Sequence, residues 1–331
     1  MSLTLDYALS CAEANTSIGT KNLPLLQYAW DSTSLGALKT CPFKYFLSVI
    51  LGYSGKKKDA LEFGIAFHSA MQKYHYAKAE GASHKDSIVA ALREGIRSFS
   101  ETDPDTGLIR IYESGTKERN LYALLRAIVW HLDHHNDNGF REDICKTVVL
   151  DNGKPAAELS FRFSPDLNLP AEFTELYLCG HMDHVVTHND SLYIKDYKTC
   201  KSLSSNYFDQ YNPDNQMTLY TLAGNIVFGL PVRGVIIDAI QLGVHFARFQ
   251  RGYSYRTPEQ LEGWLEDTEF WLHQAHTCAS RNHWPQNDKS CNMYGGCEFR
   301  AVCSAPYSLH KQLLDSQFTQ RTWDPLQTRE A

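Results

Sequence analysis

Apolar residues in the first half of the chain recur at helical spacing. Between residues 60 and 79, Phe63, Phe67, Met71 and Tyr74 follow one another at intervals of three or four positions, which predicts an amphipathic helix. An arm over residues 1–30 lacks such a period. The same periodicity predicts further helices over 83–101, 119–137, 215–230 and 257–280, and one that begins near Ser34 and turns at Pro42.

Beyond residue 140 the hydrophobic period shortens to two, which is typical of β-strands. Asn-Gly, Pro-Asp and Asn-Asp pairs, all turn formers, separate these stretches. The predicted strands cover 146–153, 158–167, 175–190, 191–199, 232–243 and 245–257. Helices followed by a small mixed sheet with one helix inserted predict a single α/β domain with helical additions. We expect this domain over 31–305, after an arm over 1–30 and before a tail over 306–331.

Composition and charge narrow the class of protein. The chain has 331 residues, 43% apolar and 21% charged, as in an ordinary globular protein of one large or two modest domains. A net charge of −6 argues against a globally basic nucleic-acid binder, although carboxylates that bind metals also add negative charge. No run of about 18 apolar residues predicts a membrane span, and no secretory signal opens the chain. We therefore expect a cytoplasmic protein whose nine cysteines are buried, metal-bound or reactive.

A carboxylate and an ammonium group stand two positions apart in LYIKDYKTCK, residues 192–201. In a strand, Asp196 and Lys198 point to the same face, and Asp183 would face Asp196 from the preceding strand of one hairpin. If that face is exposed, Asp196 and Lys198 form a solvated ion pair. If it is an active site, two carboxylates and a backbone carbonyl suit Mg²⁺ or Mn²⁺, and the lysine can orient an attacking water.

Two helical motifs would add to such a site. His68 follows Gly64 by four residues, and the glycine would let another group approach the helix closely; alternatively, His68 is an ordinary histidine of an amphipathic helix. Gln216 and Tyr220, four positions apart, share one helix face. They are either an exposed glutamine and a core tyrosine, or two neutral groups that contact a DNA backbone or the catalytic side chains.

Three cysteines, Cys291, Cys297 and Cys303, fall within thirteen residues near the end of the sequence, with five residues between neighbours. Zinc sites favour pairs that are two to four residues apart, and three thiolates need a fourth ligand. Cys41 and Cys278 are the candidates for that ligand. Four thiolates hold either an iron–sulfur cluster or zinc.

The motifs S-x₆-C-P, G-x₃-H, G-x₂-D, D-x-K, Q-x₃-Y and the last cysteines follow one another in this order. From about residue 32 to residue 304, the chain resembles the PD-(D/E)XK nucleases of the RecB type. More narrowly, it resembles their iron–sulfur branch, which includes AddB nuclease domains and the CRISPR adaptation exonucleases. The resemblance implies a restriction-endonuclease-like core, in which helices flank a small mixed sheet. It also implies a Mg²⁺- or Mn²⁺-dependent DNA exonuclease of recombination or repair.

The resemblance further implies a role for each matching residue. Lys198 would position the attacking water. The metal ligands would be His68, Asp183, Asp196 and the carbonyl of Tyr197, with Glu158 extending the site to a second metal and Gln216 and Tyr220 completing the catalytic set.

A [4Fe–4S] cluster is implied as well, with zinc as the alternative. Relatives often have two residues in the first gap between the last cysteines, where this chain has five. The cluster ligands would be Cys41, Cys291, Cys297 and Cys303. Contacts to the DNA backbone would come from Ser34, Lys56, Lys57, Lys58 and Lys201, with Lys195 as a further candidate.

Other functions of the same fold stay open. The chain could be a structure-specific endonuclease, or a DNA-binding subunit without catalysis, although the intact set of His68, Asp183, Asp196 and Lys198 argues against the latter. No G-x₄-G-K-[ST] motif occurs in the sequence, so we expect a free-standing bacterial or phage nuclease. Its substrate would be linear DNA, single-stranded or with ends, and a recombination or replication protein is a further possible partner.

Overall fold

The computed structural model describes residues 20, 23, 25–55, 59–103, 106–111, 116 and 118–328. Internal contacts divide the chain into two compact units. The first unit has residues 1–56, 160–180 and 257–330, and the second has residues 57–159 and 181–256. The boundary falls inside strands β6 (Ala157–Phe163) and β7 (Tyr177–His188). The limits of a single domain over 31–305 stay a prediction.

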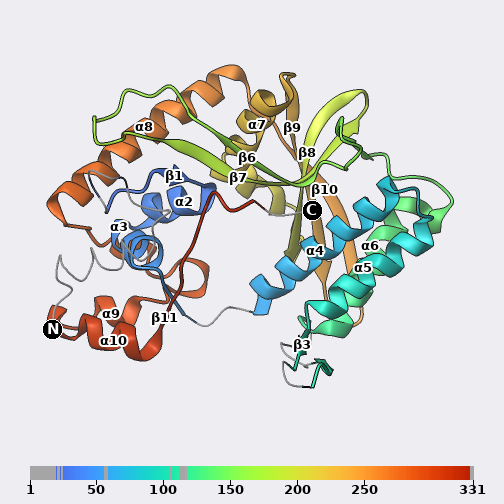
Figure 1. Ribbon diagram of the computed structural model, residues 1–331, viewed down its shortest axis with the longest axis horizontal. Helices are drawn as coiled ribbons and strands as arrows, with labels where there is room; N and C mark the ends of the chain where they lie inside the picture. Colours follow the sequence, from blue (N-terminus) through green and yellow to red (C-terminus); the bar gives the residue numbers. More distant parts are fainter. Residues whose placement is uncertain are drawn as a thin grey trace. The chain divides into compact units, whose positions relative to one another are not determined.

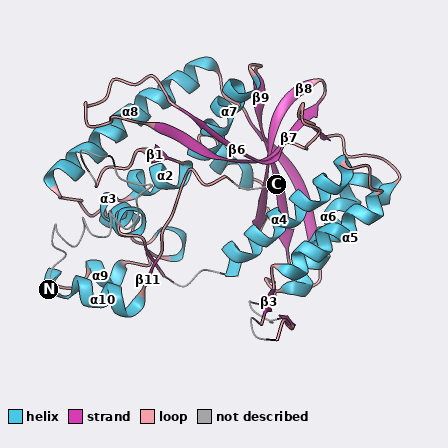
Figure 2. Ribbon diagram, viewed as in Figure 1, coloured by secondary structure: helices cyan, strands magenta, loops and turns pink. Residues whose placement is uncertain are grey.

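A mixed sheet forms the centre of the second unit (Figure 2). Strand β8 (Ser191–Cys200) runs antiparallel to β7 and parallel to β9 (Val232–Leu242), and β10 (Ala247–Ser254) runs antiparallel to β9. The short β5 (Lys146–Thr147) pairs with the far end of β7. Strand β8 thus lies inside the sheet, and its residues 193–197 are all buried.

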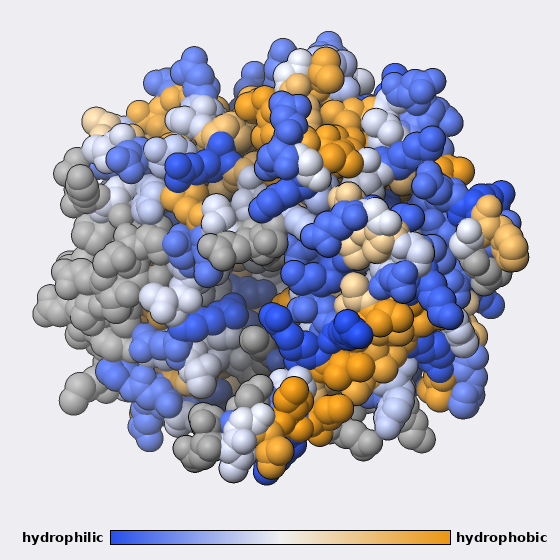
Figure 3. Space-filling model, turned by 45° about the vertical axis from the view of Figure 1, so that its right-hand side comes forward, coloured by the Kyte–Doolittle hydropathy of each residue, from blue (hydrophilic) through white to orange (hydrophobic). Residues whose placement is uncertain are grey.

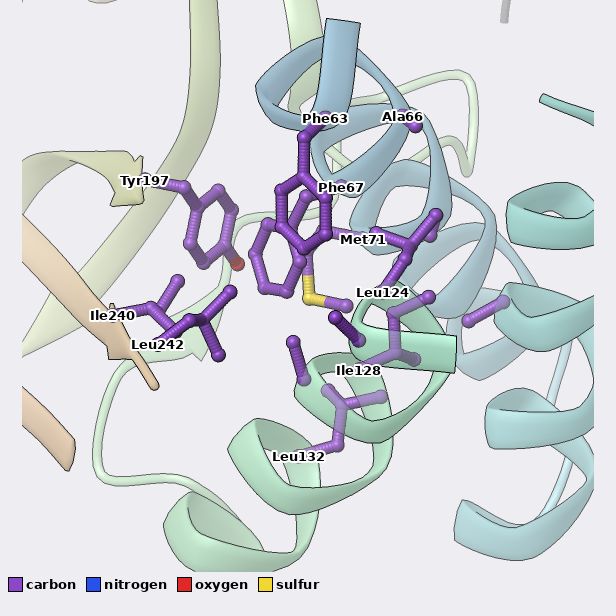
Figure 4. Close-up of a cluster of buried hydrophobic side chains, with 14 of the residues drawn as sticks. Phe63, Ala66, Phe67, Met71, Leu124, Ile128, Leu132, Tyr197, Ile240 and Leu242 are labelled. Carbon is purple, nitrogen blue, oxygen red and sulfur yellow. The ribbon is translucent and has the colours of Figure 1, made fainter. Parts of the chain in front are cut away.

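Helices cover both faces of this sheet (Figure 1). They are α4 (Asp59–Ala79), α6 (Leu121–Asn136) and α7 (Asn215–Phe228), while α5 (His84–Arg97) packs on α4 and α6. Tyr197 of β8 points toward α4, where its ring centroid lies 5.9 Å from that of Phe67 (Figure 4). Ile194, on the opposite face of β8, lies against Gly224 of α7, where an added Cβ would come within 3.3 Å of the Ile194 side chain. Successive residues of β8 therefore serve two different packed layers.

Short polar side chains fix where these helices begin. Ser83, Asn120 and Asp214 each accept a hydrogen bond from a backbone N–H in the first turn of α5, α6 and α7. Helix α7 ends at Gly229, whose φ of 59° is left-handed. These signals are local in the sequence, which explains why the helix starts were predictable.

One apolar core joins α4 and α6 to the sheet (Figure 4). Phe63 and Phe67 of α4 pack with Leu124 and Ile128 of α6 and with Ile240 of β9, and all five are fully buried. The phenylalanines belong to the stripe that the helical period predicted. Burial of apolar surface contributes about 25 cal/mol per Å², so this cluster is a main stabiliser of the second unit.

Aromatic rings around Trp30 hold the first unit together. The Trp30 ring stacks on Tyr45 at 5.3 Å between centroids, and Trp284 lies 5.4 Å from both Tyr45 and Phe46. Strand β1 pairs in parallel with the start of β7, and β11 pairs with β2. The elements of this unit are β1 (Ala29–Trp30), α2 (Ser32–Thr40), α3 (Pro42–Tyr45), a π-helical turn (Phe46–Ile50), β2 (Tyr53–Ser54), α8 (Pro258–Arg281), α9 (Arg300–Cys303), α10 (His310–Gln317) and β11 (Thr319–Gln320).

The structure differs from the predicted elements mainly where segments are short. The helix predicted over 83–101 ends at Arg97, because β3 (Ser100–Thr102) pairs instead with β4 (Ile109–Ile111). The strand predicted over 146–153 is reduced to β5. The tail predicted from residue 306 contains α10 and β11, which are too short for a clear hydrophobic period.

The surface of the chain mixes polar and apolar side chains, with the apolar ones gathered in patches on the face that Figure 3 shows. Within the described ranges, no helix combines the length and the apolar composition that crossing a membrane requires.

The core of the second unit gives a first prediction. Ile128 of α6 is fully buried, whereas Tyr122 of the same helix is 71% exposed. We expect Ile128→Ala to lower the free energy of unfolding by about 2–5 kcal/mol, because it leaves a cavity in a packed core. The control Tyr122→Ala should change it by about 0.5 kcal/mol or less. Urea denaturation measures both values, and similar losses in the two variants would contradict the assigned core.

Candidate active site

Asp196 and Lys198 project from the same face of β8, as the two-residue period of a strand requires. The Asp196 side chain is fully buried, and Lys198 Nζ lies 2.8 Å from its Oδ2. Lys198 also donates to Gln216 Oε1 at 2.9 Å, and Gln216 Nε2 donates to the Tyr220 hydroxyl at 3.0 Å. The D-x-K and Q-x₃-Y motifs thus form one hydrogen-bonded chain, and the burial of Asp196 excludes a solvated edge strand.

Asp183 comes to this site from β7. The pairing of His184 with Lys195 places Asp183 opposite Asp196 one step further along the hairpin, as the sequence predicted. Asp183 Oδ2 accepts a hydrogen bond from the backbone N–H of Tyr197 at 3.0 Å, and the side chain is 6% exposed. This hydrogen bond orients the carboxylate relative to the D-x-K motif.

His68 reaches the two strands from α4. Its Nδ1 lies 3.3 Å from Asp183 Oδ2 and 3.6 Å from Glu158 Oε1, and its Nε2 lies 2.9 Å from the carbonyl oxygen of Tyr197. Gly64, one turn earlier, leaves this side of α4 open. A Cβ on Gly64 would meet Thr199 Oγ1 at an ordinary contact distance of 3.9 Å. Among the described residues, none makes the close approach that was expected at this glycine.

Glu158 enters the site from β6 with an unusual backbone. Its φ of 52° lies in the left-handed region, which residues other than glycine rarely adopt. Its side chain is 4% exposed. Strained residues of this kind persist only where their surroundings over-determine them, and they cluster at functional sites. Glu158 is therefore part of the buried group and is not a solvated side chain of the strand.

Burial and neighbouring charges set the protonation of this group. Burial disfavours the charged form of His68, but the carboxylates of Asp183 and Glu158 outweigh it and raise the pKa of His68 to about 10. Burial raises the pKa of Asp196 to about 6, against the lowering effect of Lys198. Burial also lowers the pKa of Lys198, but the attraction of Asp196 and Asp183 outweighs it, so this pKa ends above its ordinary value. Lys198 therefore stays an ammonium group.

His68, Glu158 and Asp183 present donors that suit a divalent cation, since their three ligand atoms lie within 4.8 Å of one another. Ligands of an octahedral ion with bonds of about 2.1 Å lie about 3 Å apart. His68 Nδ1 comes near this spacing, at 3.3 Å from Asp183 Oδ2 and 3.6 Å from Glu158 Oε1, while its Nε2 is hydrogen-bonded to the Tyr197 carbonyl oxygen. Asp196 lies beside the group, with its carboxylate on Lys198. The arrangement can hold one Mg²⁺ or Mn²⁺ next to the ammonium group of Lys198.

Two residues that were predicted to contact DNA are buried, so these two predictions are wrong. Ser34 is fully buried, and its hydroxyl accepts a hydrogen bond from the backbone N–H of Asp31 in a capping box of α2, so it offers DNA no surface. Lys195 is 1% exposed and its Nζ lies 3.6 Å from Asp143 Oδ2, so it belongs to the interior. Lys201 is exposed and stays a prediction. Lys56, Lys57 and Lys58 lie outside the described residues.

The aromatic residues near position 43 are buried. Phe43, Tyr45 and Phe46 are at most 8% exposed. They pack in the core of the first unit and offer no exposed ring on which a DNA base could stack.

A second polar group surrounds the side chain of Tyr197, and sequence reasoning missed it. The Tyr197 hydroxyl lies 3.0 Å from His75 Nε2 and 3.3 Å from His184 Nδ1. Since Tyr197 follows Asp196, its side chain points to the opposite face of β8. One sequence signal could have indicated this contact. His184 directly follows Asp183, as Tyr197 follows Asp196, so both side chains are expected on the face opposite the two carboxylates. These contacts hold the residue whose backbone bonds to both His68 and Asp183.

Four cysteines line one cavity of the first unit. Its volume is about 280 Å³, and Cys41, Cys291, Cys297 and Cys303 all line it, whereas the described Cys278 does not. Burial and then the three neighbouring thiols raise the pKa of Cys303 to about 11. The structure thus brings together the set that the family resemblance implied, with Cys41 as the fourth member.

The comparison with known protein families identifies the class of protein. The sequence model of the PD-(D/E)XK nuclease superfamily matches residues 30–304. Because the match covers most of the chain, the protein belongs to the PD-(D/E)XK nuclease superfamily. Its mixed sheet flanked by helices confirms the predicted restriction-endonuclease-like fold.

Several solved structures are similar to this chain. One of them, a protein from Eubacterium rectale that is provisionally named an exonuclease, is 13% identical, with a TM-score of 0.46 over 94% of this chain and 98% of its own. No curated protein matches the chain.

The pKa of His68 makes the stability of the metal-free protein depend on pH. The folded value of about 10 lies above the ordinary 6.5, so the stabilisation by protonated His68 is complete below pH 6.5 and is lost as the pH rises through 10. Between these limits, we expect the free energy of unfolding to fall more steeply in the wild type than in His68→Gln, by about 1 kcal/mol per pH unit.

Urea denaturation in EDTA measures this difference. The exposed His245 supplies the control His245→Gln, which should keep the wild-type slope. Equal slopes in the wild type and in His68→Gln would show that His68 is not held by the two carboxylates.

Proposed function

We propose that this nuclease is a metal-dependent DNA exonuclease. The observation that carries the proposal is the buried Asp196 carboxylate, paired with the half-buried Lys198 beside the donors of His68, Glu158 and Asp183. Apolar residues can replace a buried ion pair at little loss of stability, so a pair kept next to a metal-binding group points to catalysis. The ordered motifs, which resemble nucleases that act on DNA ends, support the choice of an exonuclease.

The proposed roles follow from the contacts of each side chain. A bound ion would polarise the scissile phosphate and lower the pKa of the attacking water. The Lys198 ammonium group, held between Asp196 and Gln216 at 2.8 and 2.9 Å, would donate to that water and offset negative charge as it develops. The proposed ligands of Mg²⁺ or Mn²⁺ are His68, Glu158, Asp183, Asp196 and the carbonyl of Tyr197.

A charge-neutral substitution tests the proposed chemistry. Asp196→Asn keeps the size of the side chain and removes its charge. We expect it to slow Mg²⁺- or Mn²⁺-dependent cleavage of end-labelled linear DNA about 10²-fold or more, since the charge that orients Lys198 is lost. DNA binding, measured by a mobility shift, should stay near the wild-type value.

The exposed Asp190, in the turn between β7 and β8, supplies the matched control. Asp190→Asn should cleave at the wild-type rate. EDTA should stop cleavage by the wild type and by Asp190→Asn. Wild-type activity in Asp196→Asn would overturn the proposed site. If the wild type binds DNA but cuts nothing with either metal, the alternative of a DNA-binding subunit takes its place.

The form of the DNA separates the exonuclease from the endonuclease alternative. An exonuclease shortens linear DNA and leaves a covalently closed circle intact. Cleavage of the circle at a comparable rate would favour a structure-specific endonuclease with the same active site.

We further infer that the cysteine cavity holds a [4Fe–4S] cluster. Zinc, bound by thiolates at about 2.3 Å, sits enclosed among its ligands, whereas a cavity of about 280 Å³ has room for a larger group. Four thiolates are the usual ligands of such clusters. The cluster would join Cys41 to residues 291–303 within the first unit.

Colour and metal content test this inference. Anaerobically purified protein should be brown, absorb near 400 nm or so, and contain about four irons per chain. Cys297→Ser should lose most of this absorbance, because one of four ligands is gone. Cys200, which lies in the second unit, supplies the control Cys200→Ser, which should keep it. A colourless protein with one zinc per chain would favour the zinc alternative.

A further inference from the structure

A second group of potential metal ligands lies in the second unit, on the other face of the sheet. It consists of His131 and His135 of α6 and Asp238 of β9, whose ligand atoms lie within 4.8 Å of one another. Asp238 pairs with Tyr197 across β8 and β9, so its side chain shares the face of Tyr197 and points away from the face of Asp196. This group is therefore separate from the proposed catalytic site.

The nitrogen atoms of both histidines converge on one carboxylate oxygen. His131 Nε2 lies 3.1 Å and His135 Nε2 lies 3.5 Å from Asp238 Oδ1. Ligands of a tetrahedral ion with bonds of 2.0–2.1 Å lie about 3.3 Å apart, which falls between the two distances. The i, i+4 spacing on α6 brings the two rings together, with centroids 4.7 Å apart.

Hydrogen bonding within the protein accounts for only part of this arrangement. His131 Nε2 is hydrogen-bonded to Asp238 Oδ1. His135 Nε2 is buried and lies 3.5 Å from the same oxygen, but within the described part of the chain this contact is long and no hydrogen bond of regular geometry reaches the atom. A buried polar atom with only a long, poorly aligned contact is incompletely satisfied, which is unfavourable. A cation between the three ligand atoms would bind this nitrogen.

The surroundings orient the carboxylate and leave a way in. Arg251 Nε donates to the other oxygen, Asp238 Oδ2, at 3.0 Å, which leaves Oδ1 for the histidines, as partners of a metal-binding carboxylate do. His131 and His135 also line a cavity of about 310 Å³, so a fourth ligand position is accessible from that side.

Charge selects the class of ion. Arg251 and Lys195 already lie next to the carboxylates of Asp238 and Asp143, so the site has little negative charge left to attract a hard cation such as Mg²⁺. Two imidazole nitrogens favour a transition metal. We propose that His131, His135 and Asp238 bind a transition-metal ion such as Zn²⁺ or Co²⁺ on the face of the sheet opposite the catalytic carboxylates.

Metal stoichiometry tests the proposal with no measurement of nuclease activity. Equilibrium dialysis against Zn²⁺ should show one ion fewer per chain in His135→Ala than in the wild type. His134 is the neighbouring exposed histidine of the same helix, and His134→Ala should keep the wild-type number. In Co²⁺-loaded protein, the ion at this site has no thiolate ligand, so it contributes visible ligand-field bands without thiolate charge-transfer absorption. His135→Ala should lose these bands.

The same comparison in an Asp183→Asn background separates this site from the proposed catalytic site. If the site exists, His135→Ala removes one ion there too, whatever the outcome for catalysis. His135→Gln, which keeps more of the side-chain volume, should also lose the ion, and circular dichroism checks that both variants are folded. Equal numbers of bound ions in the wild type and in both folded His135 variants would show that the group is a hydrogen-bonding network only.

Discussion

The burial of the Asp196 carboxylate is the constraint on which the site depends. An ionised carboxylate inside a protein costs several kcal/mol unless a charge or several hydrogen bonds compensate it. Lys198, two residues along the same strand, supplies the charge at 2.8 Å. Gln216 of α7 accepts a second hydrogen bond from the Lys198 ammonium group. The helix that covers this face therefore also completes the hydrogen-bonded group.

Strand β8 has both faces covered, and its alternation sorts the ionisable side chains into two layers. Asp196 and Lys198 face α7, while Lys195 and Tyr197 face α4 and α6. Tyr197 connects the layers, because its side chain is held by His75 on one face, while its backbone N–H donates to Asp183 on the other face and its carbonyl oxygen lies 2.9 Å from His68 Nε2 of α4. The packing of one layer therefore bears on the geometry of the other.

The first unit is assembled from three segments that are far apart in the sequence, so long-range contacts must hold it together. Aromatic packing around Trp30 joins residues near 45 to Trp284. The cysteine cavity brings residue 41 next to residues 291–303. A bound cluster would add covalent ties at the same place. The unit would then rely less on apolar packing alone.

Much of the fold and part of the site follow from local patterns in the sequence. The helical stripe of Phe63 and Phe67, the caps of α5 to α7 and the alternation of Asp196 and Lys198 all depend on near neighbours, whose spacing the backbone dictates. Family membership follows from the order of such motifs. Local patterns do not determine which residues distant in the sequence come into contact, or which side chains are buried.

Tertiary packing decided those points. It placed Glu158, with its strained backbone, against His68, and it buried Ser34 and Lys195 away from DNA. It also brought His131 and His135 to Asp238, 107 and 103 positions further along the chain. The physical reason is that burial and long-range contact depend on how whole elements pack, and no local period in the sequence records that packing.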